Sequence, residues 1–406
     1  MSMNTMHDIK RAAACLLVLV TLAQPGGLSV ADAYTLNRNI AHTGSCPMNQ
    51  RWAAATPGIV NRRWSTSMAA SANVITNIAA VPGDTVNIQI DRAIRSSFDV
   101  WTSVGTSLTP TSLGNLTQVS TQNACSISDG LNSICFNQAS GSFSSGVLAF
   151  TIVNSWDEVG IQAVPNHPLT SFIAEIVDAD IYFRPLDSAN FTFATREAFA
   201  ANPNSFDLES VLTHELGHFF GFSHSAVMRA MMYPYASRGI VTGTARCTPG
   251  TVCDTPLADD DRAGLRVLYP NAADTTNVGS ISGYVLPANP LTLTGLPAPS
   301  PGRSVTGIFG AHVVAVDAAT GAVVAGTLGG WSCNPSSLPT QFDGFYKIEG
   351  LPVGRSYKLF VEPLDGPTDS TNIANAINDL CSQVTLNDVC TPPTVNTGFT
   401  TKIKPQ

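Results

Sequence analysis

Charged side chains are scarce in this 406-residue sequence. Asp, Glu, Lys and Arg make up 12% of it, with 29 acidic and 21 basic residues and a formal net charge of −8. No run rich in lysine or arginine occurs along the chain. Because proteins that bind nucleic acid or anionic membrane surfaces carry such a run or patch, the composition excludes both kinds of partner.

Long apolar runs are also lacking. The apolar run 12–23 is too short to span a bilayer, and no later segment has the length required. It follows Lys10 and Arg11 and precedes a small-x-small pattern at 31–33, as in a cleaved signal peptide. We therefore expect a signal peptide over 1–33, a secreted or extracellular protein and no membrane span after cleavage. Retention as an N-terminal anchor, the periplasm and the cell surface are the alternatives.

The C-x-x-C motif is absent, so the sequence has neither the cysteine spacing of a zinc knuckle nor that of a redox dithiol. The chain has nine cysteines, and loss of Cys15 with the signal leaves an even number, which in an exported chain predicts disulfides. The connectivity stays open. Spacing alone suggests the pairs Cys125–Cys135, Cys247–Cys253, Cys381–Cys390 and Cys46–Cys333.

Internal repeats and coiled-coil heptads are not found, and the length allows two or three domains. The composition changes near 270–280, from mixed helix and strand patterns to short alternating runs between turn residues. We predict a first domain over 34–272, a linker over 273–279 and an all-β domain over 280–365. A C-terminal tail over 366–406 follows, which disulfides could tie down.

The patterning predicts an α+β fold for the first domain, in which strands come first and helices last. The strands are expected at 85–90, 133–136, 146–151 and 179–183, and the helices at 91–104, 208–221 and 259–268. Short alternating runs in the second domain predict a β-sandwich. Its strands are expected at 281–286, 312–317, 322–327, 345–348 and 357–362.

Histidine is rare, with seven in the chain, yet three fall in one segment that reads His-Glu-Leu-Gly-His-Phe-Phe-Gly-Phe-Ser-His. On a helix, His214 and His218 lie one turn apart on the same face and can reach one metal ion. Gly221 can end the helix and turn the chain, so that His224 adds a third nitrogen. Three imidazoles with one open position are typical of catalytic zinc. A closed structural zinc site is the alternative, but it would not account for Glu215 directly after the first ligand.

This segment resembles the His-Glu-x-x-His-x-x-Gly-x-x-His zinc motif of the metzincin metalloendopeptidases. Downstream, 230–234 (Ala-Met-Met-Tyr-Pro) resembles the Met-turn of the matrixin branch (peptidase M10-type), and 260–269 resembles the C-terminal helix of its catalytic domain. The resemblance covers about 45–272 and implies a twisted mixed sheet with an active-site helix and one catalytic Zn²⁺. It assigns His214, His218 and His224 as zinc ligands, Glu215 as the catalytic base, and Met232 as the Met-turn residue beneath the imidazoles.

The resemblance also implies how a substrate binds. The segment 146–151 matches the metzincin edge strand, which pairs antiparallel with an extended peptide; an interior strand is the alternative. The segment that follows the Met-turn is expected to form one wall of the pocket that binds the substrate residue after the cleaved peptide bond. The substrate-binding residues assigned in this way are Gly146, Val147, Leu148, Ala149, Tyr233 and Pro234.

The chain departs from the vertebrate matrixin pattern in its metal-binding loops. A His/Asp-rich loop for a second, structural zinc is not found, and neither is a dense carboxylate loop, so calcium is unsupported. Cys46 lacks the Arg-Cys-Gly context of an inhibitory pro-segment and is assigned to a disulfide. Because Pro234 places Met232 at the Met-turn, Tyr233 is not counted as a ligand, and core packing is the alternative role for Met232.

The second domain resembles the carboxypeptidase regulatory-like, transthyretin-like β-sandwiches through 281–285, 311–317 and 342–354. An accessory module for substrate or surface attachment is implied, with a passive spacer as the alternative. The whole sequence predicts a secreted zinc metalloendopeptidase acting on proteins or peptides, its oligomeric state left open. A non-enzymatic secreted adhesin or binding protein on a degenerate protease scaffold is the alternative, against which the intact Glu215 argues.

Overall fold

The computed structural model describes a large part of the chain, with gaps. The described residues are 17–18, 36–39, 46, 48–53, 62–65, 86–108, 116–119, 129–136, 143, 146–165, 167–184, 192–195, 205–227, 230–234, 236, 257–288, 306–332 and 342–363. Most of the expected signal segment and all of the expected tail lie outside them. Among the described residues, none of the helices combines the length and apolar character that a membrane crossing requires.

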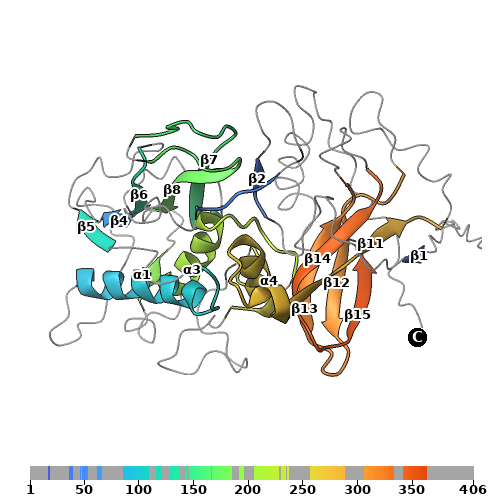
Figure 1. Ribbon diagram of the computed structural model, residues 1–406. Helices are drawn as coiled ribbons and strands as arrows, with labels where there is room; N and C mark the ends of the chain where they lie inside the picture. The colour runs from blue at the N-terminus through green and yellow to red at the C-terminus, as the bar shows by residue number, and fades with distance from the viewer. Residues whose placement is uncertain are drawn as a thin grey trace, which may run out of the picture.

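The first part is built on a five-stranded mixed sheet in the order β5-β4-β6-β8-β7 (Figure 1). Its strands are β4 (Arg62–Ser65), β5 (Leu116–Val119), β6 (Asn132–Cys135), β7 (Ala149–Trp156) and β8 (Glu175–Phe183). Neighbouring strands run parallel except β7, which is antiparallel to β8 and lies at the edge of the sheet. This mixed sheet, with helices packed on it, agrees with the expected α+β class.

Short two-residue strands flank this sheet. They are β2 (Arg38–Asn39), which pairs with β3 (Met48–Asn49), and β9 (Phe193–Ala194), which pairs parallel with β10 (Phe206–Asp207). The β10 strand leads directly into the helix that carries the histidine motif. Its position therefore ties the start of that helix to the body of the domain.

The first helix, α1 (Val86–Thr102), begins earlier than expected. The prediction of a strand at 85–90 is wrong, because the apolar residues there continue a helical stripe. Ile90, Ile94, Phe98 and Trp101, spaced three and four apart, are all buried. The alternation of apolar and polar residues within 85–90 is too short to decide for a strand against the helical spacing of apolar residues that continues to Trp101.

The motif helix, α3 (Leu208–Phe219), is confirmed with the expected start. Asp207 caps it, its carboxylate accepting hydrogen bonds from the main-chain N–H groups of Glu209 and Ser210. A capping carboxylate satisfies otherwise unpaired N–H groups and complements the helix dipole. The start of the motif helix is thus fixed by local chemistry, nearly two turns before the first histidine.

The far end of α3 is held by aromatic donors from distant parts of the chain. The indole of Trp52 donates to the carbonyl of Phe219 at 2.7 Å, and the hydroxyl of Tyr269 donates to that of Phe220 at 2.9 Å. Trp101 donates from α1 to a carbonyl in the middle of α3. Since the last carbonyls of a helix lack partners within it, the bonds from Trp52 and Tyr269 satisfy buried acceptors and fix where α3 ends, while the bond from Trp101 joins α1 to α3.

The chain continues through α4 (Asp259–Leu268), as expected, into two three-stranded sheets of order β1-β11-β14 and β13-β12-β15. The bounds are β1 (Leu17–Val18), α5 (Asp274–Asn277), β11 (Val278–Leu286), β12 (Ala311–Asp317), β13 (Val323–Gly329), β14 (Phe345–Pro352) and β15 (Tyr357–Glu362). The five expected strands are all found: β15 has the expected bounds, and the other four differ from the expected bounds at one or both ends. The sandwich arrangement and the domain boundaries stay predictions.

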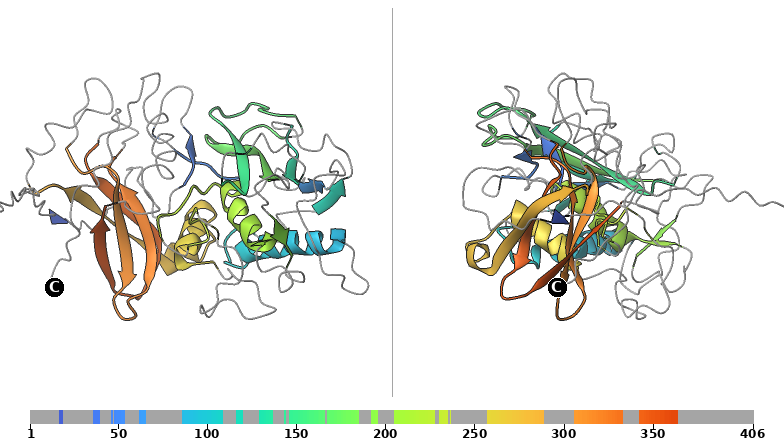
Figure 2. Two further views of the ribbon diagram at one scale, coloured as in Figure 1. Left: turned by 180° about the vertical axis from the view of Figure 1, so that it is seen from behind. Right: turned by 90° about the vertical axis from the view of Figure 1, so that its right-hand side faces the viewer.

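The two parts of the chain pack closely together. In Figures 1 and 2, α4 lies between α3 and the strands β13 and β14. It contacts both of these strands. One cluster of buried apolar side chains runs through the interface, from Leu265 and Leu268 on α4 to Ile348 and Leu351 on β14. The expected linker 273–279 is occupied by α5 and the start of β11.

The turn after α3 depends on Gly221, which has a φ of +104°. A Cβ there would collide with the carbonyl oxygen of Gln50. We expect Gly221→Ala to lower the free energy of unfolding by at least about 3 kcal/mol, through backbone strain and steric overlap. Gly354→Ala is the matched control, because Gly354 has a φ of +77° and open space around it.

Denaturant unfolding monitored by circular dichroism measures both variants. The control is expected to lose about 1 kcal/mol, the cost of positive φ alone. Equal losses in the two variants would show that the contact with Gln50 contributes nothing.

Candidate metal centre

The structure brings the three histidines of the motif together. His214 and His218 come from α3, and His224 comes from the chain that turns back at Gly221. Their ligand atoms all lie within 4.8 Å of one another. The ring centroids are 5.0 Å (214–218), 5.3 Å (214–224) and 4.8 Å (218–224) apart. The group could hold a single metal ion.

Two of the rings are oriented by main-chain carbonyls. His214 Nδ1 lies 2.7 Å from the carbonyl oxygen of Met231, and His218 Nδ1 lies 2.9 Å from that of Phe222. A carbonyl only accepts hydrogen bonds, so each Nδ1 carries the proton and donates it. In both rings Nε2 is therefore left with its lone pair, the state in which imidazole binds a metal.

Burial keeps the imidazoles neutral. It lowers the pKa of His214, and burial together with the nearby His214 lowers the pKa of His218 to about 3. Burial and the other two rings lower the pKa of His224 well below its ordinary value. A neutral imidazole already has one nitrogen without a proton, so it can bind zinc without first losing a proton.

The donor set fits zinc. Three nitrogen ligands at about 2.1 Å from a tetrahedral ion lie about 3.4 Å apart, so small ring rotations would suffice here. Three neutral nitrogens leave one position open, and each ring keeps part of its surface exposed. Their assignment as zinc ligands nevertheless stays a prediction.

Glu215 points to strand β7. It is 4% exposed, and its Oε2 accepts a hydrogen bond of 2.6 Å from the hydroxyl of Thr151. Burial raises the pKa of Glu215 to about 7, although the bond from Thr151 opposes the rise. A carboxyl with a pKa near neutrality can both accept and return a proton. Sequence reasoning identified Glu215 but not its partner on the strand.

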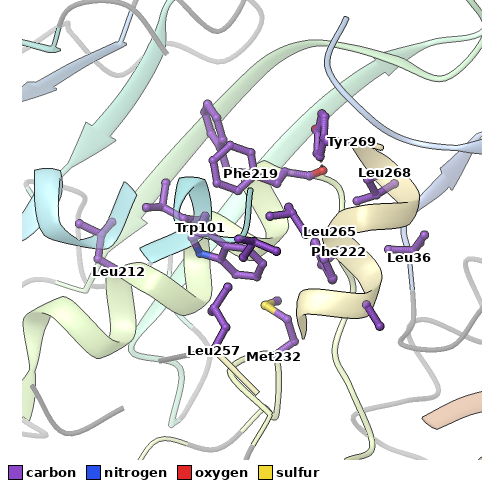
Figure 3. Close-up of a cluster of buried hydrophobic side chains, with 14 of the residues drawn as sticks. Leu36, Trp101, Leu212, Phe219, Phe222, Met232, Leu257, Leu265, Leu268 and Tyr269 are labelled. Carbon is purple, nitrogen blue, oxygen red and sulfur yellow. Dashed lines mark hydrogen bonds between the residues drawn. The ribbon is translucent and has the colours of Figure 1, made fainter. Parts of the chain in front are cut away.

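Met232 packs against the motif helix. Its side chain is fully buried among Trp101, Leu257 and Leu265, as Figure 3 shows. A Cβ added at Gly217, between the first two histidines, would overlap the Met232 sulfur. Contact with the underside of the metal-binding helix agrees with a Met-turn role, which stays a prediction. Met231 is only partly buried, so the two neighbouring methionines are not equivalent.

Asp261 at the start of α4 holds this turn in place, which sequence reasoning did not find. Its carboxylate accepts hydrogen bonds from the N–H groups of Met231 (2.7 Å), Met232 (3.1 Å) and Ala258 (3.0 Å). Burial raises the pKa of Asp261 to about 6, because the three N–H bonds only partly offset the desolvation. The carbonyl oxygen of Met231 in turn accepts the hydrogen bond from His214 Nδ1.

The neighbouring Asp260 connects the loop after His224 to the second part of the chain. Its carboxylate accepts a bond from the hydroxyl of Ser225 at 2.6 Å and another from the N–H of Gly326, on β13, at 2.8 Å. Burial and the adjacent Asp261 raise the pKa of Asp260 to about 7. Two successive aspartates at the start of α4 thus hold the loop after His224 and the turn at Met231 and Met232.

The expected substrate strand lies next to the site. Gly146, Val147 and Leu148 precede β7, and Ala149 is its first residue. The main-chain N–H of Arg184 donates to the carbonyl of Leu148, and its guanidinium donates to that of Val147. Tyr233 and Pro234, the other expected pocket residues, follow Met232 and are partly buried. All six roles stay predictions.

The cysteines are described at two positions only. Cys46 and Cys135 are each disulfide-bonded. Each predicted pairing includes at least one cysteine outside the described residues, so the connectivity stays a prediction.

Comparison with known proteins points to one family. Residues 174–270 match the sequence model of the family described as matrixin. The match begins just before β8 and ends after α4, so it includes the three histidines, Glu215, Met232 and Asp261.

Two plant proteins align over similar stretches. Metalloendoproteinase 1 of Glycine max is 41% identical over 66 residues, 16% of this chain and 18% of that protein. Metalloendoproteinase 2-MMP of Arabidopsis thaliana is 36% identical over 91 residues, 22% of this chain and 21% of that protein. The chain therefore spans about a fifth of the length of these curated relatives. It contains a matrixin-like domain.

Proposed function

We propose that this protein is a zinc-dependent metalloendopeptidase. The observation that supports this most strongly is the convergence of three neutral imidazoles beside a buried glutamate. The matrixin match over this same region and the names of the plant relatives agree with it. A purely structural zinc site would not account for a buried glutamate, hydrogen-bonded to Thr151, directly beside the ligands.

The chain's own residues divide the work of hydrolysis. His214 and His218 would hold the ion through their free Nε2 atoms, and His224 through a nitrogen of its ring. A zinc ion bound there supplies a Lewis acid for the scissile carbonyl and activates a water molecule. Glu215 accepts the proton of that water as its oxygen attacks the carbonyl carbon, then delivers the proton to the amine nitrogen as the C–N bond breaks.

Strand β7 offers the place for an extended peptide. The bond between Arg184 and Leu148 fixes which groups of β7 face β8. Since hydrogen-bonding directions alternate along a strand, the main-chain groups of Ala149, Thr151 and Val153 face the open edge. Among the described strands, none pairs with that edge. A substrate lying antiparallel to β7 would pass beside Glu215, to which Thr151 is bonded.

The remaining parts of the chain fit an exported enzyme. We infer that 1–33 is a cleaved signal, whose removal would take β1 (Leu17–Val18) from its place beside β11. We also infer that the even set of cysteines forms disulfides and that the protein acts outside the cytoplasm. The strands after α5 form the accessory module, which in this chain also packs against α4.

The proposal is tested by digestion of casein and of an internally quenched peptide with and without 1,10-phenanthroline. We expect the chelator to lower hydrolysis more than about 100-fold and stoichiometric Zn²⁺ to restore it, because the open-site ion supplies the nucleophile. Mass spectrometry of the products should show internal cuts. Cleavage that persists in the chelator would exclude the zinc dependence that we propose. A folded, zinc-loaded chain that cuts neither substrate would exclude the peptidase function and favour the adhesin alternative.

A further inference from the structure

The hydroxyl of Thr151 makes an unusually direct link between the sheet and the motif helix. Its Oγ1 lies 2.6 Å from Glu215 Oε2 and 3.1 Å from the main-chain oxygen of the same residue. A hydroxyl has one hydrogen to donate, and an ionised carboxylate is the stronger acceptor. The shorter contact is therefore the main bond, from Thr151 to the carboxylate.

This bond is what orients the carboxylate. Within the described part of the chain, no other side chain donates to the Glu215 carboxylate, whose residue is almost completely buried. A glutamate side chain has three rotatable bonds, so a single strong contact at Oε2 selects one arrangement among several. That arrangement leaves the second oxygen, Oε1, to take the proton of the attacking water.

Thr151 also belongs to the strand edge on which the substrate is expected. Its main-chain N–H and C=O face the open side of β7, while its side chain faces α3. One residue thus contacts both the peptide to be cut and the group that moves the proton. A valine, which is as well suited to a β-strand, would occupy the same space without supplying the bond.

We propose that Thr151 is a positioning residue that holds the Glu215 carboxylate in register with a peptide paired to β7. The inference rests on the proposed peptidase function. A hydrogen bond to a charged group that is made throughout the reaction affects the geometry of proton transfer more than the binding of substrate. Loss of the hydroxyl should therefore lower kcat and leave KM nearly unchanged.

The test compares Thr151→Val and Thr151→Ser by steady-state hydrolysis of one quenched peptide. We expect the valine variant to lose about 10- to 100-fold in kcat, with KM within about twofold of the wild-type value. The serine variant keeps the hydroxyl and should stay within about threefold of wild type. Zinc content, measured by mass spectrometry, and melting temperature should be the same in all three proteins.

A matched control removes a hydroxyl elsewhere. Thr276→Val deletes an exposed α5 hydroxyl that donates to the main-chain carbonyl of Ala273, the residue before the helix, far from the site in sequence. Its kcat should equal that of wild type. A Thr151→Val protein with wild-type kcat would overturn the proposal, and so would equal losses in the valine and serine variants.

The test separates this inference from the function on which it rests. If the wild-type chain is active and Thr151→Val matches it, only the role of Thr151 falls. If the folded, zinc-loaded wild-type chain cuts no peptide, the peptidase assignment falls, and the positioning role falls with it.

Discussion

Replacing Glu215 by glutamine is expected to lower peptide hydrolysis by at least about 10³-fold while the protein stays folded and zinc-loaded. General acid–base catalysis by a positioned side chain contributes about 10²- to 10⁴-fold, and an amide cannot accept the proton. The change is nearly isosteric, and the amide oxygen can still accept the hydrogen bond from Thr151. The loss is therefore expected in kcat rather than in folding.

The experiment measures kcat/KM, zinc content and melting temperature for Glu215→Gln beside an exposed control, Glu158→Gln. The control should match wild type in all three. A Glu215→Gln protein that keeps more than a tenth of wild-type activity would show that another group takes the proton, and the assigned mechanism would have to be abandoned.

The motif helix is the part of the fold that the sequence predicted best. Its start at Leu208 and the convergence of three histidines were predicted, and both depend on contacts within about 17 residues, as does the cap at Asp207 that the structure adds. Such features follow from helical spacing, capping chemistry and one glycine turn, all of which are local. The same holds for α4, whose predicted and observed bounds agree.

The groups that orient these residues were not predictable in the same way. Thr151 lies 64 positions before its partner, and Asp261 lies 29 or more after the turn it holds. Asp261 is the third of three consecutive aspartates at a helix start, a pattern that normally indicates a solvated cap. Only the folded chain shows that Asp259 is exposed while the other two are buried.

A linker over 273–279 was predicted from the composition of the chain. The packing of this segment shows why composition alone is a weak guide to linkers. The segment 273–279 is polar, yet Asp274 is buried and its carboxylate accepts from the N–H of Asn271. Gly350 approaches the main chain of Ala263 so closely that a Cβ would overlap it. Contacts of this kind join the strands after α5 to the part of the chain that holds the histidine motif, and they depend on shape, which the hydrophobic pattern does not carry.

Asp261→Ala is expected to have the largest effect on stability among the substitutions considered. Removal of the carboxylate leaves three N–H groups without their acceptor, and Met232 at least is fully buried. An unsatisfied buried donor costs about 1–3 kcal/mol, so we expect a loss of about 3–5 kcal/mol in the free energy of unfolding. Asp261→Asn, which keeps one acceptor oxygen, should lie between wild type and alanine.

The same substitution should weaken zinc binding, which distinguishes a role at the metal centre from simple stabilisation. The turn that Asp261 holds presents the carbonyl of Met231 to His214, and loss of such an outer partner lowers metal affinity about 10- to 100-fold. Asp259→Ala, in the same helical turn but exposed, is the control and should cost at most about 1 kcal/mol. Denaturant unfolding and competition with a zinc-binding dye measure the two effects. An Asp261→Ala protein that is destabilised but binds zinc with full affinity would show that the aspartate stabilises the fold only. Loss of both stability and zinc affinity would show that one carboxylate holds the Met-turn and the first zinc ligand.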